Sequence, residues 1–362
     1  MDTAELLKRL SQAVGISGYE KPVRALIREE FGRYADQVQT NKMGSLIALK
    51  RGAPLEEPSA PRRRIMLAAH MDEIGLMVTG VEEGFLRITA VGGIDLRTLP
   101  AQPVTVHGTV GGSHALPGVI ASVPPHLLPD QDRAKVIPIE KLFVDVGLPP
   151  DEVEKQVRVG DLVSFRRQAL ELKGGLLTGK ALDNRASVAA VAVCLELLSG
   201  MRHVWDVYAV ATVQEEVGLK GALTSAFGVD PDVAIAIDVT FATQPGAKDE
   251  TFPMGKGPTV GVGPNFHPAL QQALEEAAKA QEIPYQIEPM PGSSGTDAWA
   301  IQVSREGIPT ALLSIPERYM HSPVEVIAVK DVERTGRVLA HFIAGLAPDF
   351  MDTLTLFPQD EE

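Results

Sequence analysis

The sequence predicts an α/β fold, in which a mixed, mostly parallel sheet is flanked by helices and interrupted by an inserted small all-β domain. Helix and strand patterns are mixed in the first 72 residues and alternate again after residue 180. Between these parts, short Val, Thr and Ile runs alternate with Gly and Pro. The length of 362 residues fits two domains of roughly 150 residues or more. We therefore expect residues 1–72 and 167–362 to form one discontinuous domain, with residues 73–166 as the insert.

The N-terminal part begins with two amphipathic helices. The apolar residues of both helices recur at helical spacing. In the first helix they are Leu6, Leu7, Leu10 and Val14, and in the second Val23, Leu26, Ile27 and Phe31. Two strands are expected next, at residues 45–49 and 64–69. The second is apolar enough to be buried on both faces, as strands of a parallel sheet are.

The insert has the pattern of a small barrel or sandwich. Strand-like runs occur at residues 86–90, 104–108, 142–146 and 161–165, and turn signals separate them. Within this region, residues 123–139 contain four prolines and few strand formers. They are expected to form a long loop, and loops of this length are often functional.

The C-terminal part alternates helices with strands, which is typical of a mostly parallel sheet. Helices are expected at residues 186–198, 270–280 and 331–346, and strands at residues 204–213, 233–237 and 309–315.

Composition excludes several classes of partner. With 34 Lys and Arg against 47 Asp and Glu, the net charge is −13, so we expect no nucleic acid and no anionic membrane surface as a partner. No apolar run reaches about 18 residues, so no membrane span is expected. The single cysteine, Cys194, lies in an apolar run, and the N-terminus lacks the pattern of a signal peptide. These features favour a cytoplasmic protein.

Polar side chains gather at the ends of the expected strands. Ligands of open α/β sheets bind at the carboxyl ends of the strands, so residues there should meet at one edge. Six such residues lie at or just after the strand ends, and they are His70, Asp72, Glu215, Glu216, Asp238 and His321. A seventh, Asp183, precedes the helix at 186–198.

This set of side chains points to a dinuclear metal site. Two imidazoles with several carboxylates and no cysteine suit Zn²⁺, Co²⁺ or Mn²⁺. Five ligands are too many for one tetrahedral ion but suit two ions about 3.5–4 Å apart that share a carboxylate. Neighbouring residues at a strand end point to different sides, so Glu216 can bind metal while Glu215 acts as a general base. Asp72 faces the same side as His70 and is placed to orient its imidazole.

Each of these residues also has a structural interpretation. Asp183 could cap the following helix, and an isolated Glu-Glu pair is usually a solvated surface. Asp297 or its neighbour Thr296 could likewise cap a helix or contact the site. The joint occurrence at one sheet edge is what favours a functional site.

Six ordered segments resemble the motifs of the dinuclear glutamyl-aminopeptidase-type family, the tetrahedral aminopeptidases, whose members are often labelled cellulase or endoglucanase. The resemblance covers nearly the whole chain, including the insert. The segments are Ala69-His70-Met71-Asp72-Glu73-Ile74-Gly75, Ala181-Leu182-Asp183-Asn184-Arg185, Gln214-Glu215-Glu216-Val217-Gly218, Ile237-Asp238-Val239-Thr240, Gly295-Thr296-Asp297-Ala298 and Tyr319-Met320-His321-Ser322.

The resemblance implies a fold like that of zinc peptidases, with a PDZ-like insert, and roles that agree with the reading of the residues. Asp183 would bridge two divalent ions, zinc or cobalt, and a non-proline cis peptide would follow it. Glu215 would be the general base, and Asp72, the second catalytic residue, would be the partner that orients His70. The remaining ligands would be His70 and Asp238 for one ion, and Glu216 and His321 for the other.

The resemblance also implies a homo-oligomer. In this family the inserted domain serves oligomerisation, and dimers assemble into a hollow dodecamer with inward-facing sites. The loop at residues 123–139 could then reach the site of a neighbouring subunit.

The function expected from this is a metallo-exopeptidase that removes N-terminal residues from short peptides. A metal-bridging hydroxide would be the nucleophile, with Glu215 as the base. A related deacylase or carboxypeptidase is the main alternative. A glycoside hydrolase would leave both histidines without a role, and the chain has only 5% aromatic residues for a sugar cleft. A shell-forming protein with a vestigial site would be expected to have lost some of the six motifs.

Overall fold

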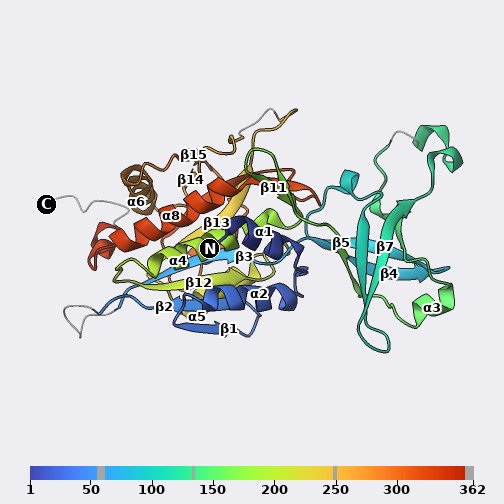
Figure 1. The fold of residues 1–362 in the computed structure, drawn as a ribbon, viewed down its shortest axis with the longest axis horizontal. Coiled ribbons are helices and arrows are strands. Elements are labelled where there is room, and N and C mark those ends of the chain that lie inside the picture. The colour runs from blue at the N-terminus through green and yellow to red at the C-terminus, as the bar shows by residue number, and fades with distance from the viewer. Residues whose placement is uncertain (55–61, 133–134, 248–250, 355–362) are drawn as a thin grey trace.

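The computed structural model describes residues 1–54, 62–132, 135–247 and 251–354 and consists of two lobes. A large α/β lobe contains the first and the last described residues, and a smaller β lobe extends from it (Figure 1). The predicted fold class, an α/β sheet interrupted by a small all-β unit, is confirmed.

The α/β lobe contains the helices α1 (Thr3–Gln12), α2 (Lys21–Gly32), α4 (Leu182–Leu198), α5 (Lys220–Val229), α6 (Pro268–Ala280), α7 (Asp297–Gln302) and α8 (Val329–Gly345). Its strands are β1 (Gln37–Thr40), β2 (Leu46–Lys50), β3 (Arg64–His70), β10 (Leu170–Leu172), β11 (Leu176–Gly179), β12 (Asp206–Thr212), β13 (Val233–Phe241), β14 (Thr259–Val262), β15 (Gln286–Pro289), β16 (Thr310–Arg318) and β17 (Glu325–Ala328).

The strands form one mixed sheet with a parallel centre. Its order is β1-β2-β12-β3-β13-β16-β17-β11-β10, and β14 pairs with β16 and β15 beside this path. The four central strands β12, β3, β13 and β16 are parallel, whereas the flanking pairs of the main path are antiparallel. Thr212 lies opposite His70 in this register, so β12 and β3 end at the same level.

Helices cover both faces of the sheet, and successive side chains of its central strands point to opposite faces. On β3, Ile65 and Leu67 join the core under α1, α2, α4 and α8, whereas Met66 joins the core under α5 and α7. Helix α8 packs closely on α4, since a Cβ on Gly336 would lie 2.6 Å from the Ala190 carbonyl oxygen. Close packing on both faces holds the strand ends in fixed positions.

Besides the strands β1, β10, β11, β14, β15 and β17, which were not predicted, two features of this lobe differ from the sequence prediction. Strand β13 continues to Phe241, which pairs with Glu317 of β16, so Asp238 lies inside the strand instead of after residue 237. Helix α5 was not predicted, and it contains Gly221 and Gly228, which weaken a helical pattern. Gly221 is needed there, because a Cβ would lie 2.3 Å from the Val213 carbonyl oxygen.

The β lobe is a closed barrel, which decides between the predicted barrel and sandwich. Its strands are β4 (Gly75–Glu82), β5 (Phe85–Val91), β6 (Pro103–Gly108), β7 (His114–Ser122), β8 (Leu142–Asp145) and β9 (Leu162–Phe165), in the order β4-β5-β8-β7-β6-β9. The short helix α3 (Pro150–Glu154) precedes β9. Residues 123–139 connect β7 to β8 with short 3₁₀ turns, and residues 133–134 of this loop lie outside the described ranges.

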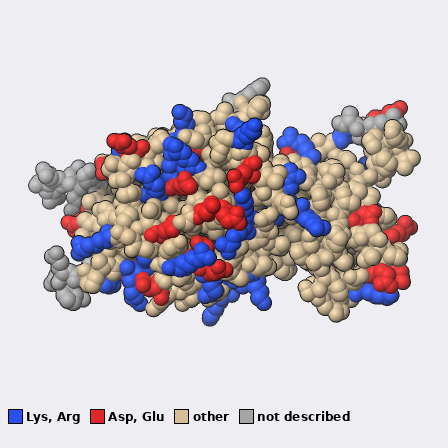
Figure 2. All heavy atoms as spheres, viewed as in Figure 1, with Lys and Arg blue, Asp and Glu red and all other residues tan. Residues whose placement is uncertain are grey.

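Among the described residues, no helix is long and apolar enough to cross a membrane. Figure 2 shows Lys and Arg interspersed with Asp and Glu over the face in view.

Candidate active site

The two predicted histidines converge on one carboxylate, that of Asp183. His70 Nε2 lies 3.1 Å from Asp183 Oδ1, and His321 Nε2 lies 3.3 Å from Asp183 Oδ2. His70 ends β3, His321 follows β16, and Asp183 lies at the start of α4, so three separate elements bring these groups together. Each oxygen of Asp183 thus faces a different imidazole, the arrangement expected of a carboxylate that bridges two ions.

The other predicted carboxylates surround this centre. Glu215 Oε2 and Asp238 Oδ1 each lie 3.9 Å from His70 Nε2, and Glu216 Oε2 lies 3.8 Å from His321 Nε2. Two sets of three residues could each hold a metal ion, because the ligand atoms within each set lie within 4.8 Å of one another. One set is His70, Glu215 and Asp238, and the other is His70, Asp183 and Glu216.

This grouping differs in two ways from the ligand pairs expected from the sequence. Glu215 stands with His70 and Asp238, although it was expected to be a base and not a ligand. His321 belongs to neither group, and its side chain is 40% exposed, whereas His70 is buried.

The backbone at Asp183 is held by a carboxylate that the sequence did not single out. The predicted cis peptide between Asp183 and Asn184 is present, and Ala181 before it is left-handed. Glu325 Oε2 of β17 accepts hydrogen bonds from the backbone N–H groups of Leu182 at 2.6 Å and Asp183 at 3.2 Å. Glu325 therefore fixes the segment that presents Asp183.

Asp72 holds the Glu215–Glu216 segment more directly than it holds His70. Its oxygens accept hydrogen bonds from Glu215 N at 3.0 Å and Glu216 N at 3.2 Å, and from the Ser17 hydroxyl at 2.5 Å. Its distance to His70 Nδ1 is 3.6 Å, longer than a hydrogen bond. Asp72 is fully buried, so these donors stabilise its charge.

The chain turns sharply before Glu215. Gln214 has a left-handed backbone with φ of 56°, and Glu20 Oε1 accepts its N–H at 3.3 Å. This turn and the hydrogen bonds to Asp72 direct both Glu215 and Glu216 toward the end of the sheet.

A buried ion pair lies next to the segment of Asp72. Lys180 Nζ contacts Glu73 Oε2 at 2.5 Å, and Glu73 Oε1 accepts the N–H of Gly15 at 2.8 Å. Because this pair links the segment before α2 to the segments of Asp72 and Asp183, it ties three stretches that are distant in sequence.

The site carries more buried negative charge than its histidines balance. Burial, together with Asp238 and Asp297, raises the pKa of Glu215 to about 9 against the opposing effect of His70. Burial and Asp183 also raise the pKa of both Glu216 and Asp238 well above the usual values. Asp183 is different, because its hydrogen bonds with His321 and His70 outweigh burial and lower its pKa.

This surplus of carboxylates matches the charge of divalent cations. Four buried carboxylates in contact range would have to take up protons unless positive charge enters the site. Oxygen and imidazole nitrogen ligands are those preferred by zinc and cobalt. The donor set therefore fits divalent metal ions.

These residues line a cavity of about 560 Å³, large enough for an amino-acid residue of a substrate. Beyond the carboxylates and histidines, its walls include Phe241, Met290 and Met320. Glu288 also lines it, and its two oxygens accept hydrogen bonds from the hydroxyls of Thr240 and Thr259, each at 2.5 Å.

The structure shows which of residues 296 and 297 caps the helix α7. Thr296 is the N-cap of α7, with its hydroxyl accepting from Ala298 N at 3.3 Å. Asp297 instead accepts a hydrogen bond from the Thr212 hydroxyl at 2.5 Å, and burial raises its pKa to about 6.

Comparisons with known proteins agree on one family. The family model of M42 glutamyl aminopeptidase matches residues 44–338. The lysyl aminopeptidase of Pyrococcus furiosus is 40% identical over 350 residues, which are 95% of this chain and 97% of that protein.

Solved structures give the same result. An aminopeptidase of the archaeon Desulfurococcus kamchatkensis is 38% identical, with a TM-score of 0.88 over 97% of both chains. The TET1 peptidase of Pyrococcus horikoshii, described as assembling into a tetrahedron or a large octahedral shell, is 34% identical, with a TM-score of 0.80 over 95% of this chain and 100% of that one. The chain therefore belongs to the M42 glutamyl aminopeptidase family and is a hydrolase of the peptidase class.

Proposed function

We propose that this protein is a dinuclear-metal aminopeptidase that removes N-terminal residues from short peptides. The observation that carries the proposal is the pair of imidazoles facing the two oxygens of Asp183, at 3.1 and 3.3 Å. The surrounding surplus of buried carboxylates and membership of the M42 family support it.

We assign the metal ligands as the sequence predicts, with zinc or cobalt as the ions. Asp183 would bridge them, and the other ligands would be His70 and Asp238 on one side, and Glu216 and His321 on the other. When bound, such a metal pair would polarise the scissile carbonyl and make a water molecule more acidic.

Glu215 would act as the general base. Its carboxylate would accept a proton from the attacking water and pass it to the nitrogen of the departing amine. Asp72 would keep Glu215 in place through the hydrogen bond to its backbone N–H. The surrounding acidic groups would also favour the positive charge of a free α-amino group, which is the feature that marks an N-terminus.

A deacylase or carboxypeptidase could use the same ligand set, and substrate tests separate these activities. A glycoside hydrolase is disfavoured because it needs no metal, and two carboxylates suffice for its chemistry. The convergence of His70 and His321 on Asp183 would then serve no purpose.

A panel of chromogenic aminoacyl amides tests the activity. Chelator-treated protein is expected to be inactive, and added Co²⁺ or Zn²⁺ is expected to restore cleavage of amides with a free α-amino group. The N-acetylated counterparts should stay intact. If metal-loaded protein cleaves only acylated substrates or only C-terminal residues, the deacylase or carboxypeptidase alternative replaces this proposal. The panel should include a lysyl amide, because the Pyrococcus furiosus relative is named for that residue.

We further propose that the protein is a homo-oligomer, with residues 73–166 as the oligomerisation domain and dimers as the building blocks of a dodecamer. The assemblies named for the TET1 relative support this. Within the loop at 123–139, Leu127 has 75% of its surface exposed, which suits a contact with a second copy.

Deletion of residues 127–137 tests the role of this loop. We expect a smaller particle by size-exclusion chromatography with light scattering, or a lower kcat, because the loop would contact a neighbouring subunit. A deletion variant with the mass and kcat of the full chain would contradict this role.

A further inference from the structure

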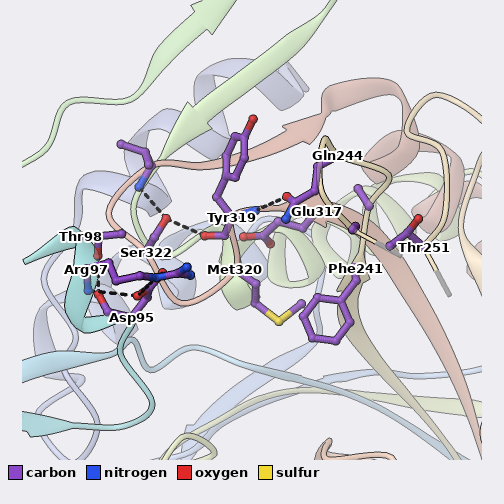
Figure 3. Close-up of a pocket in the computed structure, with 13 residues that line it drawn as sticks. Asp95, Arg97, Thr98, Phe241, Gln244, Thr251, Glu317, Tyr319, Met320 and Ser322 are labelled. Carbon is purple, nitrogen blue, oxygen red and sulfur yellow. Dashed lines mark hydrogen bonds and ion pairs between the residues drawn. The ribbon is translucent and has the colours of Figure 1, made fainter. Parts of the chain in front are cut away.

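The walls of the active-site cavity differ in how they are held. Phe241 and Met320 also line a second cavity of about 450 Å³ (Figure 3), so space lies on both sides of these apolar side chains. Glu215 and Glu216 line the active-site cavity as well, and hydrogen bonds hold the backbone that carries them. A general base acts only from a fixed position, so whatever holds this backbone affects the reaction rate.

Two carboxylates accept three successive backbone N–H groups just after β12. The N–H groups of Glu215 and Glu216 donate to Asp72 at 3.0 and 3.2 Å. The N–H group of Gln214 donates to Glu20 Oε1 at 3.3 Å. Asp72 belongs to one of the six motifs, whereas Glu20 lies in none of them. Glu20 therefore extends the support that Asp72 gives by one residue toward β12.

Helix α2 does not account for the presence of Glu20. This residue occupies the N-cap position, where Ser, Thr, Asp and Asn are preferred, and its side chain accepts no hydrogen bond from the helix. Pro22, in the first turn, has no N–H to donate. The side chain instead accepts from Gly18 N at 2.6 Å and from Gln214 N. It is thus directed away from its own helix and toward the end of β12.

The turn at Gln214 needs an external support. Its φ of 56° is left-handed, a conformation that costs free energy in any residue with a side chain. Such a conformation persists only where the surrounding structure holds it, and the hydrogen bond to Glu20 does so at its N–H group. Because the turn redirects the chain after β12, its geometry determines where Glu215 points.

The segment that presents Glu20 is itself tied to the active site. Ser17 donates its hydroxyl to Asp72 at 2.5 Å and its N–H to the carbonyl oxygen of Glu73 at 3.1 Å. Ile16 also forms a β-bridge with Glu73. These contacts fix Glu20 and Asp72 relative to each other, so the two carboxylates hold one segment between them.

We propose that Glu20 is a positioning residue for the general base. By accepting the N–H of Gln214, it holds the left-handed turn that directs the side chain of Glu215 toward the attacking water. This inference rests on the proposed aminopeptidase function, in which Glu215 is the base. It gives the segment before α2, which contains no proposed metal ligand, an effect on kcat.

Three substitutions separate the hydrogen bond of Glu20 from its charge. Glu20→Gln keeps an oxygen at the same reach without the charge, Glu20→Asp keeps the charge on a shorter side chain, and Glu20→Ala removes both. A misplacement of about 1 Å can cost about 10²-fold in rate, so we expect kcat of the metal-loaded protein to fall about tenfold in Glu20→Asp and Glu20→Ala. Glu20→Gln should stay within about twofold of the wild type, because its oxygen can still accept the N–H.

Steady-state kinetics with the best amide of the panel, beside metal analysis and circular dichroism, gives the readout. The Michaelis constant KM and the metal content should match the wild type in all three variants. Glu29→Ala, at an exposed position of α2, is the matched control and should keep the wild-type kcat. The comparison of Glu20→Gln with Glu20→Asp decides the proposal even if Glu20→Ala fails to fold.

Two results of this comparison overturn the proposal. A higher kcat in Glu20→Asp than in Glu20→Gln means that the charge acts and not the hydrogen bond. A loss of metal in step with kcat means that Glu20 supports the proposed ligand Glu216 instead of the base.

The same substitution in protein without the base tests whether Glu20 acts through Glu215. Glu215→Gln has no base to position, so adding Glu20→Asp should lower its residual kcat by less than about twofold. A general structural effect would act in both backgrounds. A further loss of about tenfold in the double variant therefore overturns the proposal.

Glu215→Gln alone separates this inference from the proposed function. If Glu215→Gln is inactive and Glu20→Asp has the wild-type kcat, only the inference fails. If Glu215→Gln keeps wild-type turnover, the proposed base fails and the inference fails with it. Failure of the wild-type protein to cleave any free-amine substrate overturns both.

Discussion

Replacing Glu215 by Gln is expected to lower kcat by about 10³-fold, within the range that general-base catalysis contributes. The amide has nearly the shape of the carboxylate but cannot accept the proton of the attacking water. The backbone hydrogen bond from residue 215 to Asp72 does not depend on the side chain, so the fold and the position of the segment should be preserved. The measurement is steady-state kinetics with the best amide of the panel.

Metal content decides whether Glu215 is a base or a ligand. Glu215 lies within ligand distance of His70 and Asp238, so a ligand role is geometrically open. If Glu215 is the base, Glu215→Gln should bind as much metal as the wild type, measured by mass spectrometry of the dialysed protein. Turnover close to wild type would exclude Glu215 as the general base. Loss of metal together with activity would instead show that Glu215 is a metal ligand.

Replacing Asp183 by Asn is expected to remove both metal ions and to abolish detectable activity. A bridging ligand needs a charged oxygen for each ion, and an amide offers one neutral oxygen. The contacts of the two oxygens of Asp183 with His70 and His321 are the structural reason for this expectation. The measurement is metal per chain, from mass spectrometry, beside circular dichroism to verify the fold.

His321→Ala is the comparison for this variant. It removes one proposed ligand at an exposed position, so it should lower occupancy at one ion more than at the other. Two ions retained by Asp183→Asn would contradict the bridging role, as would equal loss of both ions in the two variants.

The sequence predicted that these side chains gather at one place, because parallel strands end at one edge of the sheet. His70 follows a run of apolar residues in β3, and the Glu215–Glu216 pair follows another in β12. The register that pairs Thr212 with His70 brings these strand ends to the same level. For such residues, hydrophobic pattern and chain order were sufficient information.

The groups that hold the site could not be predicted in this way. Ser17, which donates to Asp72, and Glu325, which accepts from Leu182 and Asp183, are far from their partners in sequence. A lone Ser or Glu in a sequence has no spacing that marks it. Their roles depend on tertiary contacts and became visible only in the structure.

Tertiary contacts also explain where the observed secondary structure differs from the sequence prediction. The pairing of β13 with β16 carries the strand past Asp238, although residues 233–237 contain the apolar run. Helix α5 forms despite two glycines because its buried face packs under the sheet. In both cases tertiary packing outweighs local propensity.

Titration of metal into chelated protein tests the central claim most directly. Activity on a free-amine aminoacyl amide and bound metal are measured in the same samples as Co²⁺ or Zn²⁺ is added. We predict that both rise together and reach a plateau at two ions per chain, with the N-acetylated amide inert throughout. Full activity in metal-free protein, or two bound ions without cleavage of any free-amine substrate, would contradict a dinuclear-metal aminopeptidase.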